Sequence, residues 1–220
     1  MRVRKKTMKK NNIELVNYFL IGISVAMSAI SYPFLPDSIP IHWNYNGVVD
    51  EYGSKLIVLS VIPIGIFLLY LLLRYVPRID PRKKNYERFS RTYSWFRVSI
   101  LMILVVLQGV TILVSFGLTL NMGMIIQIGL GALFIFLGNL MPKIQPTYFV
   151  GIRTPWTLAN DKVWHRTHQL AGKVWVICGF LMIPLALIPV GFIQFAVLIV
   201  LIVVMVLVPT IYSYYIYKKN

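Results

Sequence analysis

The stretch LIVLSVIPIGIFLLYLLLRYV, residues 56–76, decides the fold class of this chain. It carries a single charged side chain, Arg74, and it is long enough to cross the hydrocarbon core of a bilayer, which takes about 20 apolar residues in a helix. The whole chain has the same character, because 58% of its 220 residues are hydrophobic and only 13% are charged. A water-soluble fold of this length would leave too much apolar surface exposed. The sequence therefore predicts a membrane protein.

Six stretches in all are apolar and long enough to span a bilayer. They are residues 16–34, 56–76, 96–120, 124–140, 174–190 and 193–214. The fourth is short and is interrupted by Gln127 and several glycines, and Pro189-Val190-Gly191 predicts a turn between the last two. We expect an all-α integral membrane protein with six transmembrane helices and a small external loop domain between the first two.

The positively charged side chains indicate how the spans are oriented. Of the 22 Lys and Arg residues, 21 fall in the termini, in the second and fourth connections or beside them, and only Lys55 falls in the alternate connections. Such residues are enriched on the cytoplasmic side of membrane proteins, so both termini are predicted to be cytoplasmic. The net charge of +15 is then explained by topology and by contact with anionic membrane lipids, and we expect no direct binding of nucleic acid.

This topology divides the chain into four parts. They are a basic cytoplasmic tail (1–15), the first two spans with an external loop domain (16–76, loop 35–55), a basic cytoplasmic loop (77–95), and a four-span domain with a cytoplasmic loop (96–220, loop 141–173). In the external loop, Asn46-Gly47 predicts a tight turn between short extended pieces. In the last loop, Asn160 or Asp161 is expected to cap an amphipathic helix.

Two stretches resemble the motifs of a known family. The external segment IPIHWN at 39–44, with Gly47, resembles the small domain of unknown function at the N-terminus of SdpI-like membrane proteins. Gly138-Asn139, GIRTPWTL at 151–158 and Val163-Trp164 resemble the signature of the SdpI/YfhL family. The resemblance extends over nearly the whole chain, and the six-span plan fits it.

The resemblance implies a function that composition does not show. Proteins of this family protect the bacterial plasma membrane from a secreted peptide toxin, and the founding member also holds a cytoplasmic transcriptional repressor at the membrane. We therefore expect a multi-pass immunity protein of the plasma membrane, with repressor sequestration as a second expected role and no enzymatic activity or cofactor. The alternative is a metal-dependent membrane enzyme or a small transporter of unknown substrate.

Candidates for contact with the toxin lie in the external loop. They are His42, Trp43, Asn44, Asp50 and Glu51. Asp50 and Glu51 form an acidic pair that would steer a cationic toxin toward the membrane. An equally weighted interpretation places Trp43 and Tyr45 in the aromatic belt at the bilayer surface, beside a structural turn.

The cytoplasmic signature is expected to form the structural core of the functional unit. Its residues are Asn139, Gly151, Arg153, Thr154, Pro155, Trp156 and Trp164. Arg153 is interpreted either as a buried ion-pair or headgroup anchor or as an interfacial side chain that extends toward water. Amides inside a membrane need partners, so we expect Asn139 to bind the backbone of residues 151–154 and Gln127 to bond to another helix.

The histidines offer a weak candidate for a metal site. His165 and His168 share a helix face, and Asp161 lies one turn before His165. We favour histidines on a solvated polar face and predict no metal, because the set is incomplete. All seven Asp and Glu residues fall outside the clear spans, which argues against a proton-coupled transporter.

Overall fold

The computed structural model describes residues 2–188 and 191–219. Six helices in these ranges are long and apolar enough to cross a membrane, with spans at Asn12–Phe34, Lys55–Ile79, Ser90–Ser115, Met122–Lys143, Asp161–Leu185 and Gly191–Lys219. The six predicted spans are thereby confirmed. The elements in chain order are α1 (Arg2–Ser31), η1 (Tyr32–Phe34), β1 (Ser38–Trp43), β2 (Val49–Ser54), α2 (Lys55–Ile79), α3 (Lys83–Arg88), α4 (Ser90–Ser115), α5 (Met122–Leu140), η2 (Met141–Lys143), α6 (Pro155–Ala159), α7 (Asp161–Leu185) and α8 (Gly191–Lys219).

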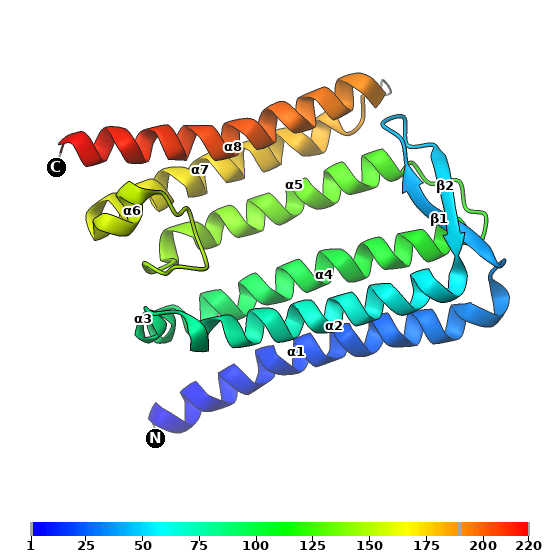
Figure 1. Ribbon diagram of the computed structural model, residues 1–220, viewed down its shortest axis with the longest axis horizontal. Coiled ribbons are helices and arrows are strands. Elements are labelled where there is room, and N and C mark those ends of the chain that lie inside the picture. The colour runs from blue at the N-terminus through cyan, green and yellow to red at the C-terminus, as the bar shows by residue number, and fades with distance from the viewer. Residues whose placement is uncertain (1, 189–190, 220) are drawn as a thin grey trace.

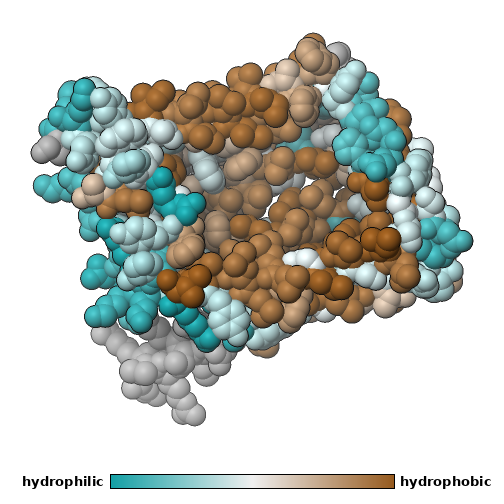
Figure 2. Space-filling view, in the orientation of Figure 1, coloured by the Kyte–Doolittle hydropathy of each residue, from teal (hydrophilic) through white to brown (hydrophobic). Residues whose placement is uncertain are grey.

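The long helices run roughly side by side between two distinct ends (Figure 1). The hairpin end carries β1, β2 and the connection from α4 to α5, and the terminal end carries both termini, α3 and α6. Figure 2 shows an apolar band across the middle of this face, with hydrophilic residues at both ends. Since the cation-rich segments of the chain belong to the terminal end, that end faces the cytoplasm.

Two helices differ in extent from the prediction. The fifth span does not begin at residue 174, because α7 runs without a break from Asp161. Its buried stripe continues through Trp164, His168 and Ala171, and no glycine pair or proline interrupts it there. The first helix begins before residue 16, so the first span includes Glu14. The expectation that every acidic residue lies outside the spans is therefore wrong.

The predicted turn at Pro189-Val190-Gly191 falls largely outside the described residues. Positions 189 and 190 are not described, and Gly191 is the first residue of α8.

The helices pack as two groups joined by α4 and α5. In the first group, α1, α2 and α4 enclose Ile66, Tyr70 and Leu101. In the second, α7 packs between α5 and α8 around Met182 and Met205. The first group therefore contains the N-terminal helix α1, and the second contains α7 and α8, which contact the signature residues.

The first group contains a buried polar contact that fixes α1 against α4. Gln108 on α4 donates through Nε2 to the Ser24 carbonyl at 3.0 Å and to the Ser28 hydroxyl at 2.9 Å. The Ser24 hydroxyl in turn donates to Gln108 Oε1 at 2.5 Å. Every polar atom of the Gln108 amide thus has a partner, as an amide inside a membrane requires.

The second group depends on four glycines at the contact of α5 with α7. Gly138 faces Gly172, and Gly131 faces Gly179. A Cβ on any of the four would lie 2.6–2.8 Å from the facing carbonyl oxygen. Small residues at membrane helix interfaces allow such close approach, and the packing that results drives helix association.

The hairpin confirms the predicted turn. β1 and β2 are antiparallel, and Gly47 has φ +74°, which favours glycine. The Asn44 side-chain oxygen accepts from the backbone N–H of Asn46 at 2.9 Å and of Val48 at 3.2 Å. The turn packs against the bundle, since a Cβ on Gly191 would lie 2.6 Å from the Tyr45 carbonyl oxygen.

Candidate functional site

A pocket of about 590 Å³ opens at the hairpin end, between the hairpin, α5 and α8. Four of the five predicted outer-face residues line it: His42, Trp43, Asn44 and Asp50. The opposite wall comes from the N-terminal parts of α5 and α8, where Met122, Phe195 and Leu198 are among the apolar lining residues. The fifth predicted residue, Glu51, is exposed on β2 and is not part of the pocket wall.

An irregularity in the hairpin places His42 beside Asp50. His42 is paired in register with Glu51, and Trp43 is paired with Val49, so Asp50 is an extra residue on its strand. Such bulges redirect side chains. Here Asp50 Oδ1 lies 2.6 Å from His42 Nδ1, and both side chains remain accessible to solvent. The rim of the pocket therefore carries a carboxylate held by an imidazole.

Two buried amides support the pocket from the membrane side. Gln127 on α5 donates to the Met182 carbonyl at 3.0 Å, and Gln194 on α8 donates to the Ala186 carbonyl. Both acceptors lie near the C-terminal end of α7, and the Met182 carbonyl also accepts from the Ala186 N–H at 3.0 Å. The predicted bond from Gln127 to another helix is confirmed. Gln194 was missed, although a lone amide in an apolar span is itself a signal for such a contact.

At the terminal end, the signature residues Gly151 and Trp164 meet around His168. Trp164 is fully buried, donates from Nε1 to the Ile144 carbonyl at 2.9 Å, and stacks on the His168 ring at 4.2 Å between centroids. His168 Nε2 accepts from the Ile152 N–H at 3.0 Å, and its Nδ1 lies 2.8 Å from the Trp164 carbonyl. Gly151 has φ +110° and lies so close to His168 that no Cβ fits.

The next three signature residues form a short helix that joins α8. Thr154 caps α6 in a capping box with Thr157, and Pro155 occupies the first helical position. The Thr154 hydroxyl lies 3.0 Å from the Ser213 hydroxyl on α8. Trp156 packs against Tyr214 on the same helix, with ring centroids 5.0 Å apart. The signature residues thus connect the loop after α5 to α7 and to α8.

Two of the expected signature contacts are wrong. Asn139 is exposed and donates to the Ile135 carbonyl of its own helix at 2.8 Å, so it does not bind the backbone of residues 151–154. Arg153 is exposed and donates to the Tyr148 carbonyl at 2.7 Å, so the buried ion pair is wrong, and the alternative of a side chain that extends toward water agrees with its exposure. Both positions lie on the outward side of their segments, which sequence spacing alone does not reveal.

Asp80 connects the signature loop to the first helix group and was not anticipated. It is buried at the end of α2 and accepts from the Tyr86 hydroxyl and the Tyr148 N–H, each at 2.9 Å. Burial, and then the bond to Asp80, raise the pKa of the Tyr86 hydroxyl well above its usual range. A tyrosine hydroxyl is protonated at neutral pH in any case, and the raised pKa keeps Tyr86 a donor in alkaline solution as well.

Two separate parts of the chain match known protein families. The SdpI/YfhL protein family matches residues 143–213, and a domain of unknown function, DUF1648, matches residues 19–73. The chain is 34% identical over 212 residues to the immunity protein SdpI of Bacillus subtilis (strain 168), which covers 96% of this chain and 98% of that protein. The chain belongs to the SdpI/YfhL family. No solved structure matches it.

The two matched segments of this SdpI/YfhL protein meet at the hairpin pocket, because Gln194, Phe195 and Leu198 of the SdpI/YfhL segment line it together with hairpin residues. The DUF1648 segment holds the hairpin between α1 and α2, and the SdpI/YfhL segment holds α6, α7 and most of α8. Six spans and this family membership make the chain a multi-pass protein of the bacterial plasma membrane. The hairpin pocket then faces outward, and the signature faces the cytoplasm.

The structure does not assemble the candidate metal ligands. His168 is buried, and each of its ring nitrogens contacts a backbone group, so a metal would displace an existing hydrogen bond. The expectation that it lies on a solvated face is wrong. Asp161 lies 3.6 Å from Arg82 instead. Within residues 2–188 and 191–219, no group of three potential ligands converges.

Proposed function

We propose that this protein is an immunity protein, which protects the membrane that holds it from a secreted peptide toxin, and that the hairpin pocket receives that toxin. Support comes from one observation above all: the chain matches an immunity protein along 98% of that relative's length. The pocket adds a place for the interaction, because it opens on the outer face and is lined by hairpin residues.

The chemistry of the pocket suits an amphipathic, cationic peptide. Its walls are mainly apolar, with Trp43 and Phe195 as large aromatic surfaces, and buried aromatic contacts dominate many protein interfaces. Its rim carries Asp50, which attracts cations. A toxin held here is kept from the lipid at the point where it would otherwise enter the bilayer.

Removing the pocket tryptophan tests this proposal. We expect Trp43→Ala to lower by about tenfold the toxin concentration that halves survival, as for the loss of a central aromatic contact. The assay uses a sensitive host without its own immunity gene, exposed to the secreted toxin that the B. subtilis immunity protein counteracts. Tyr52→Ala is the matched control, because Tyr52 is an exposed aromatic residue of the same hairpin that does not line the pocket.

If Trp43→Ala protects as well as Tyr52→Ala and the unmodified chain do, at equal amounts in the membrane, the pocket has no part in protection. Loss of protection in both, with normal amounts of protein, would assign the function to the whole hairpin surface. If the unmodified chain gives no protection, the immunity proposal itself fails for this toxin.

The acidic pair offers a second and separate comparison. We expect Asp50→Asn to reduce protection about two- to fivefold, since a charge near the surface contributes modestly, and Glu51→Gln to leave protection unchanged. Both changes remove one negative charge from the hairpin, but only Asp50 lines the pocket. The effect of Asp50→Asn should shrink at high salt. A salt-independent loss, or equal losses in both variants, would contradict electrostatic steering.

Sequestration of a cytoplasmic repressor stays a prediction. The sequence offers one surface for it, the basic segment from Arg74 to Arg97, whose positive charge is already explained by topology. The enzyme or transporter alternative gains no support from His165, His168 and Asp161, because His168 serves as a structural residue.

A further inference from the structure

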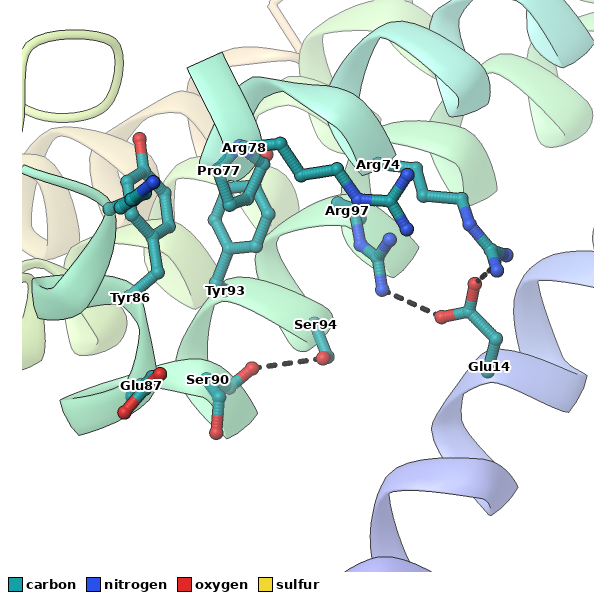
Figure 3. A pocket seen from close by; sticks show the side chains of 11 residues that line it. Glu14, Arg74, Pro77, Arg78, Tyr86, Glu87, Ser90, Tyr93, Ser94 and Arg97 are labelled. Carbon is teal, nitrogen blue, oxygen red and sulfur yellow. Dashed lines mark hydrogen bonds and ion pairs between the residues drawn. The ribbon is translucent and has the colours of Figure 1, made fainter. Parts of the chain in front are cut away.

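A second pocket, of about 530 Å³, lies at the cytoplasmic end between α1, α2, α3 and α4. Figure 3 shows Glu14 of α1 reaching toward the guanidinium groups of Arg74 and Arg97. Glu14 Oε1 lies 2.7 Å from Arg74 Nη1, and Oε2 lies 2.7 Å from Arg97 Nη2. One carboxylate therefore joins three helices at the wall of this pocket.

Positive charge exceeds negative charge in this pocket. Four cations line it, Arg74, Arg78, Lys83 and Arg97, against the two carboxylates of Glu14 and Glu87. Glu14 is already shared between two arginines. Among the described residues, no carboxylate forms an ion pair with Arg78 or Lys83. The pocket therefore has a net positive charge, and Arg78 and Lys83 belong to it without a carboxylate of the described residues to pair with.

Arg74 and Arg97, which pair with Glu14, also have N–H groups that no hydrogen bond among the described residues engages. A guanidinium carries five N–H groups, and the hydrogen bonds of the described residues engage Arg74 through Nη1 and Arg97 through Nη2. Arg97 is 7% exposed, and its Nε is buried without a hydrogen-bond partner. This Nε is enclosed by protein, so the donors left for a ligand are the other unengaged N–H groups of Arg74 and Arg97, both of which line the pocket.

The position of the pocket restricts which acceptor it meets. Its wall is built from the last turns of α2, from α3 and from the first turns of α4, so it lies where the spans end on the cytoplasmic side. The cytoplasmic leaflet presents anionic headgroups at this depth, and basic pockets between helices on this side bind them. The planar guanidinium of an arginine can donate two parallel hydrogen bonds to the oxygen atoms of a phosphate group.

We propose that this pocket binds the phosphate group of one anionic phospholipid from the cytoplasmic leaflet. Arg78 and Lys83 supply the charge that attracts the headgroup, and the remaining donors of Arg74 and Arg97 face its oxygen atoms. The Glu14 pairings hold the two arginines in place whether or not the lipid is bound. The lipid therefore joins α1, α2 and α4 at the end opposite to the hairpin pocket.

Lipid retention by the purified full chain tests the proposal. The protein in detergent is offered equal amounts of phosphatidylglycerol and phosphatidylcholine with identical acyl chains, and bound lipid is counted by native mass spectrometry. We expect preferential retention of one phosphatidylglycerol. In Arg78→Gln/Lys83→Gln that preference should fall about 25-fold, because each of the two cations near the membrane surface contributes about fivefold.

The matched control is Lys84→Gln/Arg91→Gln. These two cations belong to the same end and are exposed, but they do not line the pocket. We expect this variant to retain phosphatidylglycerol like the unmodified protein, and thermal melting establishes that both double variants are folded. Equal losses in the two variants would show a diffuse charge effect and overturn the proposal, as would equal retention of the two lipids.

A soluble phosphate ester distinguishes the lipid from a free ligand. Glycerol 3-phosphate is added in place of lipid, and the melting temperature is compared with that in phosphatidylglycerol. We expect stabilisation by the lipid and none by glycerol 3-phosphate at the same concentration. Equal stabilisation by the soluble ester would assign the pocket to a free phosphate compound and overturn the lipid assignment. Toxin survival is not used in this test, so its result is separate from that of the immunity proposal.

Discussion

Replacing Gly138 with alanine is expected to separate α5 from α7 and to cost about 3 kcal/mol in the free energy of unfolding, at the upper end for overpacking. The new Cβ would lie 2.8 Å from the Gly172 carbonyl oxygen and 3.0 Å from the Val176 nitrogen. Both are backbone atoms of α7, so the neighbouring helix has to move as a whole. Helix association in a membrane depends on this close packing, and we expect lower folded yield and lower thermal stability in detergent.

Gly65→Ala is the matched control for this prediction. Gly65 lies within the α2 span, and a Cβ there meets no atom within 4 Å. Alanine is the better helix former, by up to about 1 kcal/mol, so the control should be neutral or slightly stabilising. If Gly138→Ala melted at the same temperature as Gly65→Ala, the close contact of α5 with α7 would not be an important source of stability.

Trp164→Ala is expected to unfold the signature loop and to destabilise the protein by about 3–5 kcal/mol, as for large aromatic side chains removed from a core. Trp164 is fully buried, belongs to the cluster that includes Tyr86, Phe89 and Ile144, and stacks on His168. Its removal leaves a cavity and an unsatisfied Ile144 carbonyl. Limited proteolysis in the loop between α5 and α7, together with thermal melting, measures both effects.

Two other variants separate packing from hydrogen bonding. Trp164→Phe keeps an aromatic ring beside His168 but loses the bond to Ile144, so we expect a smaller cost of about 1–3 kcal/mol. Trp156→Ala removes a tryptophan from the same signature, but Trp156 is only partly buried and packs on the surface of α8. A Trp156→Ala variant as unstable as Trp164→Ala would contradict the central position assigned to Trp164.

The sequence predicted those features that depend on short stretches of chain. Asn46-Gly47 determines the hairpin turn through the positive φ of Gly47, and Asn160 caps α7 through bonds to the N–H groups of Lys162 and Val163. Gln127 required a partner because an amide in a membrane needs one. In each case the physical cause lies in the residue and its immediate neighbours.

Predictions from the sequence were wrong where the direction of a side chain decides its role. Asn139 and Arg153 belong to the signature, yet both point outward and bond to nearby carbonyls. His168 was placed on a polar face, but it is buried against Trp164 and Gly151. Glu14 was assigned to a tail, because the apolar stretch begins two residues later, and it joins two arginines from α2 and α4.

The sequence by itself determined the six spans, the side of the membrane on which each loop lies, and the family. The spans and their orientation follow from transfer of apolar and charged groups between water and lipid, which depends on composition along the chain. The family follows from short motifs such as GIRTPWTL at 151–158. The tertiary structure alone decided which residues form the hairpin pocket, the Trp164 core and the Glu14 pocket. Such sites bring together helices far apart in the sequence, and their contacts depend on the rotation of each helix about its own axis, which span length and charge do not specify.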